Sequence, residues 1–356
     1  MNRLFFFFSR HVRRLAGPLA VMAATCTNSC IGEEYPKEDT PHDNFEALWR
    51  LMDEHYCFFD YKKEQTGVDW NEVHDRYARR ISPSMTRLQL FEVLSGMLGE
   101  LRDGHVNLGT AFDLGRNWSY REDYARNYDE ALIETYLGQA DDYHYASSLR
   151  YRILDDNTGY VRCASFEDGI GEGNLSYMFD MLKDCNGIII DVRDNGGGSV
   201  EDAHKLASCF TNQRLLTGYT YHKQGKSHND FSSPKAEHLN PSKGVRWQKP
   251  AVVLTNRSVF SAANEFVSCM KLMPQSIVLG DTTGGGSGMP FKQELPNGWT
   301  VRYSAVVFLD AQKQHTEFGV APDTVVTLDS TDLARHRDTL IEQARRLIQS
   351  ARKSEK

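Results

Sequence analysis

The chain has 356 residues, with 41 Lys and Arg against 48 Asp and Glu, which gives a formal net charge of -7. This acidic balance, with no basic cluster that has interleaved aromatic residues, argues against a nucleic-acid-binding face. With 11% aromatic and 25% charged residues, the composition is that of an ordinary globular protein. The length is sufficient for one large domain or two modest ones.

The first residues have the features of an export signal. Arginines flank Phe5–Phe8 and precede an apolar run over 15–24, which is too short for a membrane-spanning helix of about 20 apolar residues. We therefore interpret 1–29 as a secretory signal. The small residues before Cys26 and Cys30 resemble a bacterial lipobox. We favour Cys30 as the acylated residue, because the acidic stretch after it resembles the tether of Bacteroidetes surface lipoproteins.

The signal predicts an exported, lipid-anchored protein of the outer membrane, facing either the periplasm or the cell surface. Residues 30–44 are charged and contain proline, as expected of a solvated tether. Apolar residues then recur at helical spacing within 45–101, which predicts a small helical subdomain. Its helices are expected at Phe45–Tyr56, at Trp70–Ile81, and after Ser84, which is expected to cap the third.

The next segment, 102–149, contains His105. Asp103 and Gly104 predict a turn, and a strand is expected to begin at Val106. A histidine at such a junction is usually only a hydrogen-bonding loop residue. It becomes a candidate base if folding brings a nucleophile to it.

Apolar strands alternate with helices over 150–330, which predicts an α/β core, and 331–356 predicts a closing helix. Residues 211–248 have the pattern of a long surface excursion. The strands are expected at Gly159–Phe166, Gly187–Val192, Ala251–Thr255, Ser276–Leu279, Trp299–Leu309 and Val325–Leu328, and the helices at Gly173–Lys183, Val200–Phe210 and Thr331–Ala351.

Ser261 lies where the strand Ala251–Thr255, after a polar turn, becomes a helix. Backbone N–H groups at a helix start lack internal partners and favour negative charge, so an oxyanion formed beside Ser261 would meet donors already in place. The alternative is that Ser261 serves only as the N-cap of that helix.

A glycine turn over Asn195–Gly198 follows a buried strand and precedes a helix. It fits neither of the common phosphate-binding motifs. A turn of this kind can present an amide N–H to a developing oxyanion, because glycine allows close backbone approach. The alternative is a tight strand–helix turn without further function.

Five cysteines follow the expected signal and tether. Their spacings fit no zinc site and no disulfide framework, and their neighbours are mostly apolar, so we expect small buried side chains. No motif in the sequence calls for a cofactor or a metal ion. The five are Cys57, Cys163, Cys185, Cys209 and Cys269.

Four segments occur together and in order: Leu101–His105, Ile189–Gly198, Leu254–Phe266 and Glu317–Asp323. As a set they resemble the tricorn-core and carboxyl-terminal-processing serine peptidase family, with a match over about 95–330. The resemblance implies the α/β fold of crotonase-like and ClpP-like enzymes, a β-β-α superhelix. The interval 110–148 is too short for the PDZ module that processing members carry.

The resemblance also implies roles for single residues. Ser261 matches the nucleophile, and Gly197 and Ala262 match the two oxyanion-hole amides, with an uncertainty of one glycine. The lysine base of the processing branch is missing from Thr283–Gly286, so the chain is more similar to the tricorn branch.

In the tricorn branch a histidine is the base and a glutamate orients it, and His105 and Glu317 match these positions. The relaying serine of that branch is Gly104 here, so Glu317 would have to reach His105 directly or through water.

The resemblance implies a serine endopeptidase that cleaves peptides or unfolded segments, with no cofactor. Its activity should rise through a histidine pKa in the neutral range. The absent lysine and Gly104 leave open a non-catalytic peptide-binding or scaffold lipoprotein that retains the fold. Acyl-thioester chemistry on the same fold is a third reading, disfavoured by the expected export.

Overall fold

The computed structural model describes residues 38–354. The predicted signal and both candidate lipid-bearing cysteines therefore lie outside the described residues. The described residues belong to one compact unit. Across the described part of the chain, no helix is both long and apolar enough to cross a membrane.

A seven-stranded sheet forms the larger core. Its first four pairings are parallel and its last two antiparallel. In spatial order the strands are β13 (Thr324–Val325), β10 (Ser276–Gly280), β9 (Ala251–Thr255), β6 (Ile188–Asp191), β5 (Gly159–Cys163), β4 (Leu149–Ile153) and β3 (His144–Ala146).

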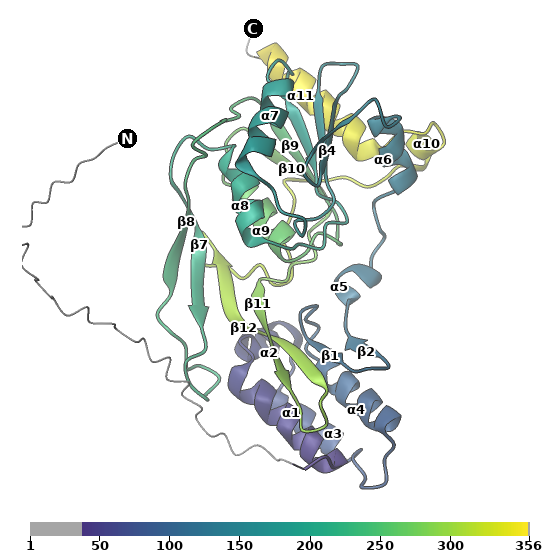
Figure 1. Ribbon diagram of the computed structural model, residues 1–356, viewed down its shortest axis with the longest axis vertical. Helices are drawn as coiled ribbons and strands as arrows, with labels where there is room; N and C mark the ends of the chain where they lie inside the picture. The colour runs from purple at the N-terminus through teal and green to yellow at the C-terminus, as the bar shows by residue number, and fades with distance from the viewer. Residues whose placement is uncertain (1–37, 355–356) are drawn as a thin grey trace, which may run out of the picture. The chain divides into compact units, whose positions relative to one another are not determined.

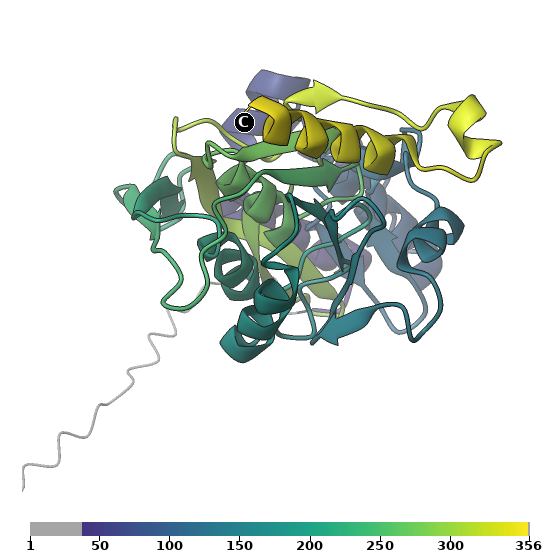
Figure 2. The ribbon, with the colours of Figure 1, turned by 90° about the horizontal axis from the view of Figure 1, so that it is seen from above.

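Helices cover both faces of this sheet (Figures 1 and 2). One face packs α7 (Glu172–Leu182), α8 (Val200–Ser208) and α9 (Ala262–Met270), and the other packs α6 (Glu130–Leu137) and α11 (Thr339–Ser354). Along β6, Ile188 and Ile190 point into the first of these cores and Ile189 into the second. Burial on both faces explains why this strand is a continuous apolar run.

A second, six-stranded sheet is built around β12 (Thr300–Asp310). The order is β2 (Leu114–Arg116), β1 (Asn107–Gly109), β12, β7 (Leu215–His222) and β8 (Lys235–Leu239), with β11 (Gly288–Glu294) also paired to β12. The N-terminal helices lie beside this sheet (Figure 1). They are α1 (Pro41–His55), α2 (Phe59–Thr66), α3 (Trp70–Ala78) and α4 (Arg87–Gly99).

The structure confirms the expected α/β class and most of the predicted elements, and it corrects four of them. The first helix begins at Pro41, inside the interval 30–44 that was predicted as a tether. Thr86, not Ser84, caps α4, through a capping box with Gln89. The expected closing helix is interrupted and forms α10 (Ser330–Leu333) and α11. The interval 211–248 is not a mere surface excursion, because it supplies β7 and β8 to the second sheet.

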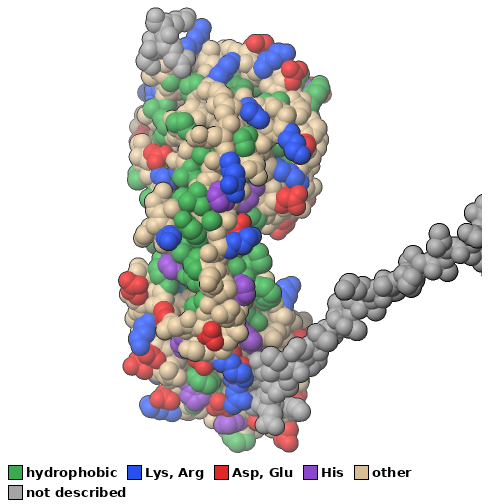
Figure 3. Space-filling model, turned by 90° about the vertical axis from the view of Figure 1, so that its left-hand side faces the viewer, with side chains coloured by type: hydrophobic (Ala, Val, Ile, Leu, Met, Phe, Trp, Pro, Cys, Tyr) green, Lys and Arg blue, Asp and Glu red, His purple; other side chains and the backbone are tan. Residues whose placement is uncertain are grey.

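The surface carries mixed charge, in keeping with the small net charge of the chain. Figure 3 views the side on which β7 and β8 lie. On that side Lys and Arg side chains are interspersed with Asp and Glu, and apolar side chains gather across its middle. The five cysteines of the described residues are all free and buried, as predicted.

Candidate active site

Two turns meet at one edge of the seven-stranded sheet. β6 and β9 are adjacent and parallel, so their carboxyl ends emerge side by side. The glycine turn follows β6 and the turn that contains Ser261 follows β9. The carboxyl edge of an open α/β sheet is where ligands usually bind. His105 reaches this edge from the other sheet, in the turn just before β1.

Ser261 precedes α9 with an unusual backbone, φ 56° and ψ −124°. A non-glycine residue in such a conformation costs of order 1–3 kcal/mol and persists only where its surroundings enforce it. Here the Ser261 amide donates to Gly285 O at 2.8 Å, and the Phe260 amide donates to Asn195 O at 3.0 Å. The Ser261 hydroxyl makes no capping bond to α9. The alternative in which Ser261 is only an N-cap therefore fails.

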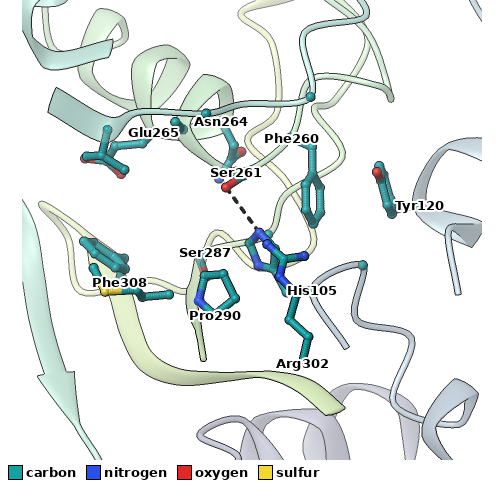
Figure 4. Close-up of a pocket in the computed structure, with 18 of the residues that line it drawn as sticks. His105, Tyr120, Phe260, Ser261, Asn264, Glu265, Ser287, Pro290, Arg302 and Phe308 are labelled. Carbon is teal, nitrogen blue, oxygen red and sulfur yellow. Dashed lines mark hydrogen bonds between the residues drawn. The ribbon is translucent and has the colours of Figure 1, made fainter. Parts of the chain in front are cut away.

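The Ser261 hydroxyl instead faces the imidazole of His105 (Figure 4). Ser261 Oγ and His105 Nε2 are 3.2 Å apart, although the two residues are 156 positions apart in the sequence. The His105 ring is 2% exposed and packs against the ring of Phe260. Burial lowers the His105 pKa to about 4, so the ring is neutral at neutral pH.

Asp103 fixes the turn that holds His105. One of its carboxylate oxygens accepts the His105 amide at 2.7 Å, and the other accepts the hydroxyls of Tyr56 and Ser304 at 3.0 and 3.1 Å. Tyr56 belongs to the N-terminal helical region and Ser304 to β12. The sequence presented Asp103 only as a turn residue, because its partners lie far away in the chain.

Glu317 lies in the same buried region without bonding to His105. Its Oε1 accepts Lys62 Nζ at 3.0 Å and its Oε2 accepts the Ser287 amide at 2.9 Å. Within the described residues His105 Nδ1 has no hydrogen-bond partner. The direct contact predicted between Glu317 and His105 is therefore not made. The contact through water stays a prediction.

Lys62, on α2, is the residue of this region that the sequence did not reveal. Its side chain is 0% exposed, and besides Glu317 it contacts Arg102 O at 3.3 Å and the ring of Phe318 at 4.2 Å. Burial and the nearby Asp103 raise the pKa of Glu317 to about 7, and the ammonium of Lys62 opposes this shift. A buried cation supplied by the N-terminal helices thus stabilises the ionised form of Glu317.

The amides predicted as oxyanion donors, and that of the glycine beside Gly197, differ in their hydrogen-bond partners. The Gly197 amide donates to Asn195 Oδ1 at 2.9 Å, so it is already used. Gly198 pairs with Phe166 as in a parallel sheet. The hydrogen bonds of this pair are made by the residues on either side of Gly198, since Gly197 O accepts from the Phe166 amide and the Ser199 amide donates to Phe166 O. The N–H of Gly198 itself therefore points away from Phe166. Gly198 lines the cleft beside Ser261. The Ala262 amide donates to no backbone acceptor among residues 38–354.

The glycine at 197 is expected to be indispensable for the geometry of Ser261. Its φ is +102°, and an added Cβ would lie 2.8 Å from the Ser261 Cβ and from Phe260 O. We expect Gly197→Ala to lower the free energy of unfolding by roughly 1–3 kcal/mol, measured in denaturant. Gly196→Ala is the matched control, since its Cβ meets nothing within 4 Å. Equal stability of the two variants would contradict this account.

A buried ion-pair network involves residues that lie directly before the glycine turn in the chain. Arg193 is fully buried and bonds to Asp191 on β6 at 2.7 Å and to Asp338, just before α11, at 2.9 Å. The pairing ties the end of β6 to the C-terminal helix.

Ser261 and His105 line a cleft of about 730 Å³. Its walls are largely apolar and aromatic, including Tyr120, which stacks on Phe260, and Phe308 and Pro290 on the opposite side (Figure 4). Arg302 and Glu265 are among its charged lining residues. A cleft of this size and lining suits an organic ligand with apolar side chains.

Comparisons with known proteins agree with this geometry. The sequence profile of Peptidase family S41 matches residues 157–326, and that of the Tricorn protease C1 domain matches 37–99. A putative peptidase from Parabacteroides merdae, known as a crystal structure, is 51% identical, with a TM-score of 0.83. That match covers 87% of this chain and 97% of the other.

Two curated relatives are similar over shorter shares of their length. The carboxy-terminal processing protease CtpA of Bacillus subtilis is 26% identical over 161 residues, 45% of this chain and 32% of its own. The tricorn protease homolog of Saccharolobus solfataricus is 23% identical, over 83% of this chain and 33% of its own. The chain thus spans about a third of these two relatives. Its fold, its site and these similarities together show that it belongs to peptidase family S41, a family of serine-type peptidases.

Proposed function

We propose that the protein is a serine endopeptidase with Ser261 as nucleophile and His105 as general base. The observation that carries this proposal is the 3.2 Å separation of Ser261 Oγ from His105 Nε2 inside a cleft. A serine hydroxyl is a poor nucleophile unless an adjacent base takes its proton. The positive-φ turn before α9 holds the hydroxyl toward that base.

The reaction proceeds through an acyl-enzyme. Ser261 Oγ attacks the carbonyl carbon of the scissile bond as its proton passes to His105 Nε2. The tetrahedral oxyanion accepts hydrogen bonds from the amides of Ala262 and Gly198, and losing one such donor typically costs about 3–4 kcal/mol. His105 then gives its proton to the leaving amine, and a water molecule, deprotonated by the same imidazole, releases the acyl group.

Glu317 acts from a distance in this proposal. Its carboxylate, once ionised, stabilises the imidazolium that forms on His105 when Ser261 loses its proton, and Lys62 favours that ionised form. The two buried polar atoms without a partner near it, His105 Nδ1 and Ser287 Oγ, favour a bridging water. This water would take the place of the relaying serine side chain, which is absent here because residue 104 is glycine.

The substrates are peptides or unfolded protein segments with apolar side chains at the scissile bond. Phe260, Phe308 and Met289 give the cleft walls that would receive such side chains. A library of internally quenched peptides, with cleavage sites located by mass spectrometry, tests this. Preferred cleavage beside acidic residues would contradict it.

The lowered pKa of His105 predicts the pH dependence of hydrolysis. The base must be neutral to accept a proton, and burial keeps it neutral down to about pH 4. We therefore expect kcat/KM, which reports the free enzyme, to rise through about pH 4 and not through the neutral range expected for an unperturbed histidine. A smaller second rise near pH 7, where Glu317 ionises, should disappear in Glu317→Gln. One rise centred on the ordinary histidine pKa, present in both proteins, would contradict the assignment.

We further propose export and lipid attachment at Cys30, on the basis of the sequence alone. The arginine-flanked apolar run and the acidic residues after Cys30 support it. Metabolic labelling with a radioactive fatty acid should mark the wild-type protein and not Cys30→Ser. Labelling that is lost in Cys26→Ser instead would move the anchor to the earlier cysteine.

A further inference from the structure

A second cluster of reactive side chains lies between α8 and α9. Glu265 and Cys269 are four residues apart on α9 and so project from the same face of that helix. His204 comes from α8, which packs along α9. The peptidase mechanism uses none of the three.

The ligand atoms of these side chains are spaced as in a metal site. His204 Nε2 is 3.2 Å and Cys269 Sγ 3.7 Å from Glu265 Oε1, and all three ligand atoms lie within 4.8 Å of one another. Zinc bonds of about 2.0 Å to nitrogen or oxygen and about 2.3 Å to sulfur place tetrahedral ligand atoms roughly 3.3–3.7 Å apart. The two separations from Glu265 Oε1 therefore match those of zinc ligands, and His204 Nε2 lies within 4.8 Å of Cys269 Sγ.

We propose that His204, Glu265 and Cys269 form a Zn²⁺ site. One nitrogen, one oxygen and one sulfur ligand suit zinc, whereas magnesium and calcium prefer oxygen ligands alone. Three protein ligands leave a fourth position for water. The side chains of His204 and Glu265 are 30% and 20% exposed, so an ion can enter from solvent. Cys269 is buried and lies on the inner side of the site.

Binding is coupled to a proton. Cys269 is buried and its thiol donates to Glu265 Oε1, so without metal the sulfur carries its proton. The zinc–sulfur bond forms as that proton leaves to solvent, so affinity rises with pH. Glu265 also lines the cleft of Ser261, so the ion would lie in the wall of that cleft.

Cobalt(II), the usual spectroscopic substitute for zinc, tests the site directly. Titration of the purified protein should produce a thiolate-to-cobalt charge-transfer band and strong visible bands of a tetrahedral ion, and Zn²⁺ should abolish both. Cys269→Ala should lose the charge-transfer band. Cys185→Ala, which removes another buried thiol outside the cluster, should keep it. No charge-transfer band in the wild type, or one that survives in Cys269→Ala, would overturn the proposal.

Zinc affinity, measured by competition with a chromophoric chelator, separates this site from the catalytic dyad. His204→Gln, which keeps a polar side chain on α8, should bind Zn²⁺ at least roughly tenfold more weakly. His105→Ala should bind as tightly as the wild type. The reverse pattern would place the ion on the dyad and refute the site. Neither readout depends on peptide hydrolysis.

Discussion

Ser261→Ala is expected to lower kcat/KM for a cleavable peptide by roughly 10⁴-fold or more. In the proposed mechanism, the change removes the oxygen that forms the covalent bond to the substrate. The cleft, the Ala262 amide and the Gly198 amide remain, so binding should be almost unchanged and the loss should fall on kcat. Initial rates with an internally quenched peptide, at enzyme concentrations high enough to detect residual turnover, measure it.

Ser258→Ala is the matched control, because Ser258 lies in the same turn three residues earlier and outside the residues lining the cleft. It should retain wild-type activity. If Ser261→Ala kept more than about one per cent of wild-type kcat, a nucleophilic serine at this position would be excluded. A wild-type protein inert toward every peptide would favour the scaffold alternative.

Lys62→Met is expected to have the largest effect on stability. It leaves the carboxylate of Glu317 fully buried without its cation, and breaking one side of a buried ion pair typically costs about 3–5 kcal/mol. Glu317 escapes part of this cost by taking a proton, because its pKa is already raised to about 7 and loses the opposing Lys62 charge. The destabilisation should therefore be largest at alkaline pH and smaller at mildly acidic pH.

Denaturant unfolding at several pH values measures this effect. Lys63→Met is the control on the same helix, since Lys63 pairs with Asp69 at the surface, with its side chain 63% exposed, and should leave the unfolding midpoint unchanged. Lys62→Met combined with Glu317→Gln should regain much of the lost stability and should remove the pH dependence. A loss that is the same at all pH values would show that Lys62 acts only through packing.

The features predicted best from the sequence are those whose residues lie close together in the chain. The strand–turn–helix around Ser261 and the glycine turn after β6 were predicted because apolar periodicity and turn residues lie within a few positions of each other. The pairing of His105 with Ser261 came only from the ordered set of motifs. No spacing argument joins two residues 156 positions apart.

The missed features depend on contacts between distant segments. α2 has no apolar stripe, since Phe59 and Lys62 are the two buried residues of the helix, and a lysine suggests solvent until its partner Glu317 is in place. The sequence does not distinguish the amides of Gly197 and Gly198, because the bond of Gly197 to Asn195 and the pairing of Gly198 with Phe166 form only in the fold. β7 was missed because its partner β12 lies far along the chain, and β8 pairs in turn with β7. The cysteine spacings gave no indication of the proposed zinc site, because His204 comes from another helix.

The most direct test of the central claim is covalent labelling by a fluorophosphonate, with the adduct located by peptide mass spectrometry. If Ser261 is a nucleophile activated by His105, the wild-type protein carries one adduct, on Ser261. Labelling is then lost in Ser261→Ala and becomes very slow in His105→Ala. An adduct on another residue, or labelling of Ser261 at an unchanged rate without His105, would contradict the account.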